Sequence, residues 1–527
     1  AVRVKAATFN NAYAELKKGY LEFGETVEEV FVQIAKAREF FPQIMNGDSY
    51  TFPIRTVTGQ NGILDANAAL FSNTSIGFHY SKEFTRNNMY RTNIKWKFLH
   101  SVDTEDKVRA QQFFREILFM IKNHWVRQTD TNVNNAAMYP EVMLTFPFAS
   151  SIQMIQVAWE QAYQSVFGVA PIGKIRTMTE SLAPCYSLIN GGNAAVNGIL
   201  NVDIGGGTTD MQYYMTVGNE AKYFYDSILF AGDDLWGKSY ENMPEKYDLP
   251  STGAEHFAKY ADNVLAAAQI MVGNDVKAYN DISLEGKEKI NCLLRDSNGH
   301  FVNKLASYED GNNRVCRAIL FLHYSAIMYH LTNWLALQGA SIPEVINFSG
   351  YGSKYIDLLF QNNNYLTAYS RALINKFMGG NAMFPKNFRI CFEQGNPKNV
   401  TAEGAALYAR TGAALPVTTW KQHFGFDGAP ANIPNADLLN YENNVKAYFD
   451  KFIDAFDTIF DSAEMANIPN AGNRVPRLTK DEVANLKSDA ITAYKEISTK
   501  EMQSNPHGSL SGSMFVWALK KSINNIH

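Results

Sequence analysis

The residues best suited to chemistry stand between Asn201 and Asp210, where the sequence reads N-V-D-I-G-G-G-T-T-D. Three consecutive glycines weaken a strand, because each costs backbone entropy and packs no side chain. They suit a place where another group must approach the main chain closely. Backbone N–H groups and short Thr hydroxyls can bind phosphate oxygens there, and Asp203 and Asp210 offer carboxylates to a hydrated Mg²⁺. The stretch therefore indicates a phosphate and magnesium site, and the alternative is a hairpin turn whose glycines only supply positive φ.

A second glycine turn has a similar character. F-S-G-Y-G-S-K, residues 348–354, lies where a strand-like run meets a helix-like one. Backbone donors and a helix N-terminus favour anions at such a junction. The first turn is neither a Walker A loop, since no Gly-Lys-Ser/Thr follows it, nor a G-x-G-x-x-G turn that opens a helix. The 145 positions from Gly205 to Gly350 suggest two lobes that face one nucleotide.

The elements that must position these turns alternate between strands and helices. E-V-M-L-T-F-P-F-A (141–149) and G-K-I-R-T-M-T-E (173–180) read as strands, each followed by a helix, the first of which begins after the capping residue Ser150. E-V-I-N-F-S-G-Y-G-S-K (344–354) is a further strand that runs into a helix. This alternation predicts an α/β protein whose sheets are covered by helices.

The remaining segments are predicted from their periodicity and turn residues. Residues 49–97 read as β-structure and 105–125 as an amphipathic helix, whereas 240–340 read as mostly helical with a hairpin-like interruption at Asn298–Gly299. The helical segments expected at the ends of the chain are 1–48 and, after a Gly/Pro/Asn-rich linker at 411–437, the region 438–527 with helices at 439–460 and 480–499.

Composition narrows the class of protein. The 527 residues are 46% hydrophobic and 19% charged with a net charge of −4, which is typical of a globular protein and gives no reason to expect nucleic acid or an anionic membrane as partner. No run of about 18 apolar residues could span a membrane. The cysteines at positions 185, 292, 316 and 391 lack metal-binding spacing, so we expect free thiols and a cytoplasmic protein.

V-D-I-G-G-G-T-T-D (202–210) resembles the second phosphate-binding motif of the actin and seventy-kilodalton heat-shock chaperone ATPase superfamily. Five other segments resemble motifs of that family in the family's order: T-F-P-F-A-S-S (145–151), T-E-S-L-A-P-C-Y (179–186), L-F-A-G-D-D-L-W (229–236), F-S-G-Y-G-S-K (348–354) and N-V-T-A-E-G-A-A-L-Y-A (399–409). The resemblance covers roughly residues 50–410. It implies a two-lobed actin-like (ribonuclease-H-like) ATPase fold, with 49–200 as the first lobe, 201–410 as the second with a helical insertion at about 240–315, and a helical C-terminal extension.

The resemblance implies a role for each matching residue. Asp203 would hold Mg²⁺ through water and Asp210 would help to organise the metal, while Glu180 would orient the attacking water, because positioning and electrostatics carry phosphoryl transfer. ATP or ADP would be the bound nucleotide. The residues implied to line its phosphates are Gly205, Gly206, Gly207, Thr208 and Thr209, and those implied to contact it from the second lobe and at the adenosine are Gly232, Asp233, Gly350, Gly352 and Ser353.

The sequence departs from the family at both ends. The family begins with a first phosphate motif, Asp-x-Gly-Thr, and residues 1–48 contain nothing like it, so ATP hydrolysis is expected only if that motif is supplied or replaced. Segment 1–48 resembles the N-terminal arm of some phage major head proteins, and one hypothesis is that it is foreign to the ATPase fold. Residues 438–527 read as helices rather than as the peptide-binding β-sandwich of the chaperones, so chaperone activity does not carry over.

These observations leave several functions open. The leading hypothesis is an ATP-binding protein in which Mg-ATP lies between two lobes and lobe closure signals to a protein partner. The alternatives are an actin-like cytoskeletal filament formed by self-assembly, a sugar or acid kinase on the same fold, and a structural or binding relative that no longer hydrolyses ATP.

Overall fold

A computed structural model of the chain describes part of the sequence. The described residues are 57–59, 74–75, 90–91, several helical positions between 104 and 122, 139–146, 152–180, 182–190, 198–217, 220–236, 256–260 apart from 258, 300–392, 397–411, 433–509, 513–523 and 526. The predictions for residues 1–48, for most of 49–97, for Cys292, for Asn298–Gly299 and for most of the linker 411–437 lie outside these ranges.

A five-stranded mixed sheet organises the described fold. Its strand order is β10-β9-β6-β7-β8, and β7 alone runs antiparallel to the rest. The strands are β6 (Ile199–Ile204), β7 (Thr209–Val217), β8 (Glu220–Ile228), β9 (Val345–Ser349) and β10 (Arg389–Phe392). Every residue of β9 is buried, as expected for a central parallel strand covered on both faces.

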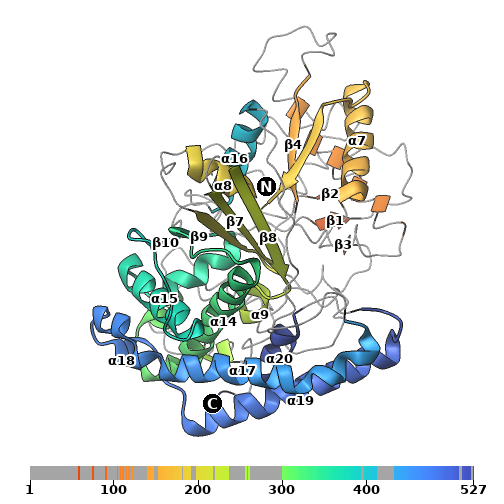
Figure 1. Ribbon diagram of the computed structural model, residues 1–527. Coiled ribbons are helices and arrows are strands. Elements are labelled where there is room, and N and C mark those ends of the chain that lie inside the picture. The colour runs from red at the N-terminus through yellow and green to blue at the C-terminus, as the bar shows by residue number, and fades with distance from the viewer. Residues whose placement is uncertain are drawn as a thin grey trace, which may run out of the picture.

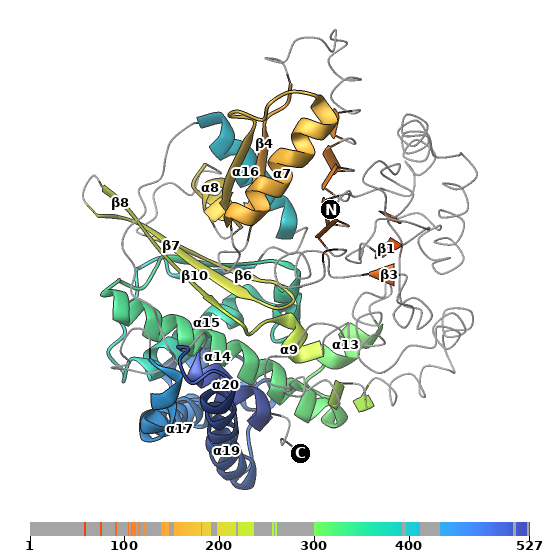
Figure 2. The same cartoon turned by 90° about the vertical axis from the view of Figure 1, so that its right-hand side faces the viewer.

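Helices cover both faces of this sheet (Figures 1 and 2). On one face lie the helices α8 (Leu182–Asn190) and α16 (Pro397–Thr411). On the other lie α14 (Arg314–Gln338) and α15 (Asn363–Phe377). From Cys316 to Leu335 every residue of α14 is buried, because the sheet, α15 and the C-terminal helices surround it. The structure is thus a layered α/β fold, as the alternation of strands and helices predicts.

A smaller unit lies beyond α8 and α16. The parallel strands β4 (Val142–Phe146) and β5 (Ile175–Thr179) pair with each other, and α7 (Ile152–Phe167) connects them. Described positions between 104 and 122 are helical, and Ala110, Phe114 and Leu118 are buried against α7. Three short strands, β1 (Val57–Gly59), β2 (Thr74–Ser75) and β3 (Tyr90–Arg91), form a separate antiparallel sheet.

The crossing of α8 and α16 depends on one glycine. A Cβ built on Gly404 of α16 would overlap the carbonyl group of Ala183 in α8. The two helices can therefore touch through their backbones only because position 404 carries no side chain. Both helices contact the strand pair β4–β5 as well as the large sheet.

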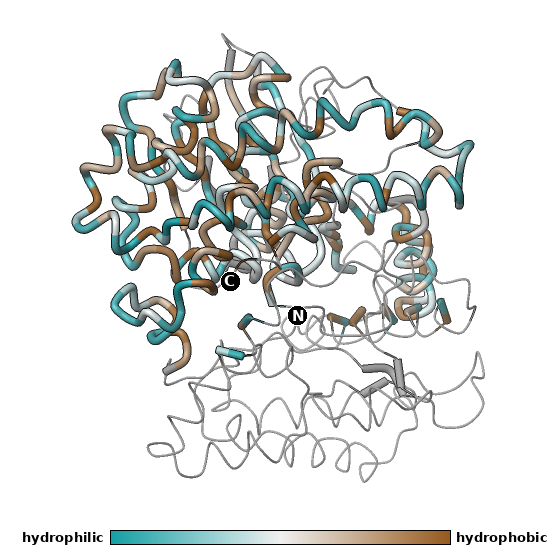
Figure 3. Tube along the Cα trace, turned by 90° about the horizontal axis from the view of Figure 1, so that it is seen from below, coloured by the Kyte–Doolittle hydropathy of each residue, from teal (hydrophilic) through white to brown (hydrophobic). Residues whose placement is uncertain are grey.

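The C-terminal helices belong to the same hydrophobic core as the large sheet. They are α17 (Glu442–Asp457), α18 (Ala471–Arg474), α19 (Lys480–Ser504) and α20 (Met514–Ser522). In α17, the ring of Phe452 lies 5.4 Å from that of Tyr329 in α14. Seen from below, hydrophilic and hydrophobic residues alternate along the outer helices, which is the pattern of helices with one buried face (Figure 3).

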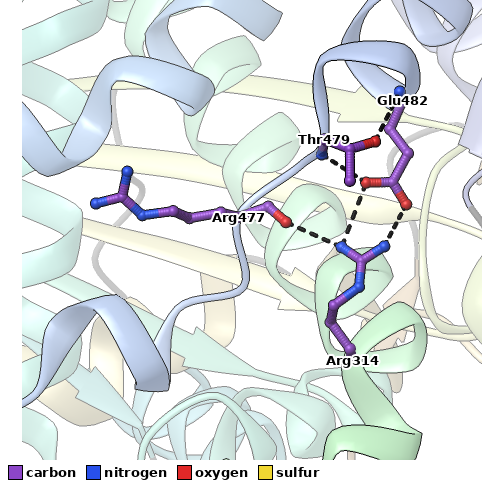
Figure 4. A network of polar contacts seen from close by, with 4 residues as sticks. All are labelled: Arg314, Arg477, Thr479 and Glu482. Carbon is purple, nitrogen blue, oxygen red and sulfur yellow. Dashed lines mark hydrogen bonds and ion pairs between the residues drawn. The ribbon is translucent and has the colours of Figure 1, made fainter.

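A polar network joins the start of α14 to the start of α19 (Figure 4). Thr479 and Glu482 form a reciprocal capping box at the N-terminus of α19. Arg314 donates to the Glu482 carboxylate at 2.5 Å and to the carbonyl of Arg477 at 2.9 Å. Burial raises the pKa of Glu482, but the bonds from Arg314 and Thr479 outweigh it, so the net pKa is lowered. The contacts fix the C-terminal helices to the central layer.

Most predicted elements are confirmed within the described residues, including the strands at 141–149, 173–180 and 344–354 and the helices at 439–460 and 480–499. Helix α13 (His300–Ala306) begins directly after the turn expected at Asn298–Gly299, which lies outside the described residues. Cys185, Cys316 and Cys391 are free thiols, as expected. Within the described ranges, no helix is long and apolar enough to cross a membrane.

Candidate functional site

The glycine-rich stretch forms the tight turn of the β6–β7 hairpin. Asp203 pairs with Asp210 and Ile204 with Thr209, and the N–H of Gly205 donates to the carbonyl of Thr208 at 2.8 Å. Gly205 does not adopt a positive φ, so a need for positive φ does not explain its presence. Gly206 at the tip is exposed. Within the described part of the chain, the N–H groups of Gly206 and Gly207 donate to no backbone carbonyl.

Two other turns meet this hairpin at the carbonyl oxygen of Gly205. The N–H of Gly232, the first residue of α9 (Gly232–Trp236), donates to that oxygen at 3.1 Å. A Cβ on Gly232 would lie 3.2 Å from the same oxygen and 3.2 Å from the Cα of Gly352. A Cβ on Gly352, in the 3₁₀ helix η4 (Tyr351–Leu358), would overlap the Gly205 oxygen. Three segments that are distant in sequence thus meet through bare backbone. The glycine turns at 205–207 and 350–352 were expected on two lobes, but they follow the neighbouring strands β6 and β9 of one sheet.

Gly350 brings the end of β9 against Asp203. It adopts φ +82°, and a Cβ there would overlap both Oδ1 of Asp203 and the carbonyl of Ile204. Only glycine satisfies this conformation and this space. Ser353, three residues after Gly350, is fully buried and donates its hydroxyl to the carbonyl of Gly350 at 2.6 Å. Ser353 therefore holds the turn in shape.

The two aspartates of the hairpin have different surroundings. Asp203 is half-buried at the end of β6. Asp210 is buried, and its two oxygens accept hydrogen bonds from the hydroxyls of Ser227 at 2.6 Å and Thr208 at 3.4 Å. Because directly paired residues share a face of the sheet, Asp203, Asp210 and Ser227 lie on one side. Asp203 is thus the more exposed of the two carboxylates.

Thr209 joins the hairpin to the segment before α9. Its hydroxyl is fully buried and donates to the carbonyl of Phe230 at 2.6 Å. The sequence suggested this threonine as a phosphate ligand, and the structure places its hydroxyl on the protein's own backbone. The N–H of Ala231 in turn donates to Oδ2 of Asp234 at 2.8 Å, which caps α9.

His323 of α14 connects the α9 and η4 turns, and sequence reasoning did not single it out as a site residue. Its Nε2 lies 3.1 Å from the carbonyl of Ala231 and its Nδ1 lies 3.0 Å from the hydroxyl of Tyr355. A carbonyl only accepts, so Nε2 carries the proton and Nδ1 accepts from Tyr355. Complete burial, assisted by the charge of Lys520, lowers the pKa of His323 to about 3. The only signal in the sequence was a histidine within an apolar helix.

Two further residues predicted for the site are Glu180 and Asp233. Glu180 lies in the turn between β5 and α8, where it is partly buried. The convergence of the three glycine turns does not include it. Asp233 lies in α9 directly after Gly232.

The site matches the requirements of a phosphate group better than those of a metal bound only by protein. Among the described residues, no group of three or more His, Cys, Asp or Glu could hold a metal ion. A hydrated Mg²⁺ needs only one or two carboxylates, because water and phosphate supply its other ligands. Asp203, at the end of β6 just before the glycine turn, is a carboxylate of the kind that such a hydrated ion requires.

Comparisons with known proteins add a weak structural likeness. No protein-family model matches the chain, and no curated protein matches it. MreB5 of Spiroplasma citri bound to ADP aligns with a TM-score of 0.36 at 14% identity, over 68% of this chain and 89% of that one. The same protein bound to AMPPNP aligns with a TM-score of 0.35, also at 14% identity and with the same coverage. Similarity of this size shows neither a family nor a function for this chain.

Proposed function

We propose that this chain is an actin-like ATP-binding protein that holds Mg-ATP or Mg-ADP at the meeting point of its three glycine turns. The observation that carries the proposal is the convergence of Gly205, Gly232 and Gly352 at one carbonyl oxygen. The convergence gathers bare backbone at one place, and backbone N–H groups at turns of this kind can bind phosphate oxygens. The strand order, with β7 alone reversed, supports the ribonuclease-H-like topology that the sequence resemblance implies.

Each group at the meeting point has a proposed task. The N–H groups of Gly206 and Gly207 bind phosphate oxygens, and Asp203 binds the water shell of Mg²⁺. Asp210 holds the hairpin in shape through Ser227 and Thr208. When bound, Mg²⁺ neutralises phosphate charge. Glu180 orients the attacking water if ATP is hydrolysed, and Asp233 approaches the nucleotide beside Gly232.

We further propose that the chain is two-lobed and that nucleotide binding changes the angle between the lobes. The helices α8 and α16 contact the β4–β5 strand pair and the large sheet, and they touch each other at Gly404. This bare crossing supports a hinge between the two units. A change in lobe angle would be the signal that a protein partner reads, or the step that allows self-assembly.

Calorimetric titration of Mg-ATP into the full chain tests the proposal. Micromolar binding is expected for the wild type, and Asp203→Asn, which removes the charge and keeps the shape, should weaken it at least about ten-fold. Asp461→Asn is the matched control, because Asp461 is exposed in the C-terminal region. Absence of binding by the intact chain contradicts the proposal.

Two further assays separate the alternatives once binding is seen. Phosphate release distinguishes an ATPase from a relative that only binds nucleotide. Sedimentation with and without Mg-ATP distinguishes a filament-forming protein from one that signals as a single unit.

A further inference from the structure

The C-terminal helix α20 reaches the α9 turn of the candidate site. Nζ of Lys520 lies 2.7 Å from Oδ1 of Asp234, and the two side chains are only 19% and 12% exposed. An ion pair screened from water in this way is stronger than one on the open surface. Figure 1 shows α20 directly beside α9. A segment outside the part that resembles the ATPase family is thus bonded to one of its glycine turns.

The bonded carboxylate also fixes the backbone of the turn. While Oδ1 of Asp234 faces Lys520, Oδ2 accepts from the N–H of Ala231 at 2.8 Å. The carbonyl of the same Ala231 accepts from His323. Both backbone polar groups of Ala231 are therefore hydrogen-bonded to side chains. Ala231 directly precedes Gly232, whose N–H donates to the carbonyl of Gly205. Lys520 is the outermost member of this chain of contacts.

The position of α20 is itself set by the other C-terminal helices. Phe515 of α20 packs 5.1 Å from Phe452 and 5.6 Å from Tyr448, both in α17, and 5.3 Å from Tyr329 in α14. α20 also packs along α19. A displacement of this helical region would therefore move Lys520 relative to the sheet, because dense aromatic packing transmits small shifts.

We infer that Lys520 is a positioning residue of the candidate nucleotide site, through which the C-terminal helices hold the Gly232 turn against Gly205. The inference rests on the proposed function for its nucleotide part. Its structural part, the ordering of residues 229–236, does not depend on any ligand. The helical C-terminal region is thereby a component of the site, and a partner bound to that region would alter nucleotide affinity through this ion pair.

Hydrogen exchange of the peptide 229–236, measured on the full chain without nucleotide, tests the structural part. Lys520→Met should speed exchange there about ten-fold by releasing Asp234, and Lys520→Arg should restore protection. The matched control is Lys495→Met, which removes a more exposed ion pair with Glu442, at 2.9 Å and with side chains 52% and 32% exposed. The control should leave this peptide unchanged. Wild-type exchange in Lys520→Met overturns the inference.

Mg-ATP titration of the same variants tests the link to the ligand. Lys520→Met should raise the dissociation constant roughly ten-fold, with rescue in Lys520→Arg and no change in Lys495→Met. If exchange rises but the affinity stays constant, the positioning role is overturned. If the wild type binds no Mg-ATP, the proposed function fails, and exchange still decides whether Lys520 orders the turn. Should Lys520→Met not fold, Asp234→Asn breaks the same pair while keeping an oxygen for Ala231, and the same outcomes apply.

Discussion

Gly352 and Gly205 lie so close that a Cβ on Gly352 would overlap the carbonyl oxygen of Gly205. This relationship between a 3₁₀ helix and a hairpin turn brings the two glycine-rich stretches of the sequence together. It also means that the smallest possible side chain at position 352 must push the two turns apart. A substitution of Gly352 therefore tests whether the two turns are in contact.

Gly352→Ala should weaken Mg-ATP binding and destabilise the protein by about 1–3 kcal/mol, because the added methyl group meets backbone that cannot move aside cheaply. Gly472→Ala is the matched control, since Gly472 has nothing within 4 Å of a built Cβ. Calorimetric titration and the midpoint of thermal unfolding measure the two effects. Equal behaviour of the two variants would show that the turns do not meet as described.

Gly404→Ala should destabilise the protein more than Gly472→Ala, by about 3 kcal/mol, because its methyl group would overlap the Ala183 carbonyl at the crossing of α8 and α16. The midpoint of thermal unfolding of Gly404→Ala should therefore be lower than that of the wild type. A Gly404→Ala variant as stable as the wild type would mean that the two helices are not in backbone contact.

The stability of the protein should fall on acidification partly through His323. Burial lowers the pKa of His323 to about 3, whereas in the unfolded chain it is near 6.5. Between these values the unfolded state binds more protons, so the free energy of unfolding decreases as the pH falls. From pH 6.5 to 4.5 this one group should remove about 2–3 kcal/mol.

The test compares His323→Phe with the wild type over that pH range. The variant loses two buried hydrogen bonds and should be less stable at pH 7, but its stability should decline less steeply on acidification. His507→Phe, at an exposed histidine, is the control. Parallel declines in His323→Phe and the wild type would rule out His323 as the titrating group.

Asp357→Asn should stabilise the protein above pH 6. Partial burial raises the pKa of Asp357 to about 6, despite the opposing effect of Lys354. In the unfolded chain the carboxyl ionises near pH 3.9, so its charge disfavours the folded state as the pH rises through 6. Because Asp357 is partly exposed, we expect a gain of about 1 kcal/mol at pH 7.5 and none near pH 4. Thermal unfolding at both pH values measures it, and a gain of equal size at pH 4 would contradict a charge effect.

Much of the fold follows from local patterns in the sequence. The alternation of apolar strands and helices between 141 and 190 predicted β4, α7, β5 and α8, because strand and helix periods differ and each buries one kind of face. The capping box at Thr479–Glu482 was not needed to predict α19, since its apolar period alone indicated the helix.

The sequence predicted which segments make up the candidate site, but not the contacts between them. Two glycine turns could be predicted from residue types and Gly232 from the resemblance, but their direct contact at the Gly205 carbonyl was not predicted. The sequence did not reveal that the hydroxyls of Thr209 and Ser353 are bonded to backbone. Nor did it reveal that His323 bonds Ala231, or that Lys520 pairs with the Asp234 that bonds the same residue. These contacts join residues far apart in the chain, which no local pattern encodes.

The sequence by itself determined which segments are strands and helices and where the backbone is bare, because local periodicity and the absence of a Cβ act within a few residues. Only the tertiary structure decided which bare segments touch, which carboxylate is buried, and that the C-terminal helix reaches α9. Those outcomes depend on how whole layers pack, since burial and hydrogen bonding of a side chain are set by its neighbours in space.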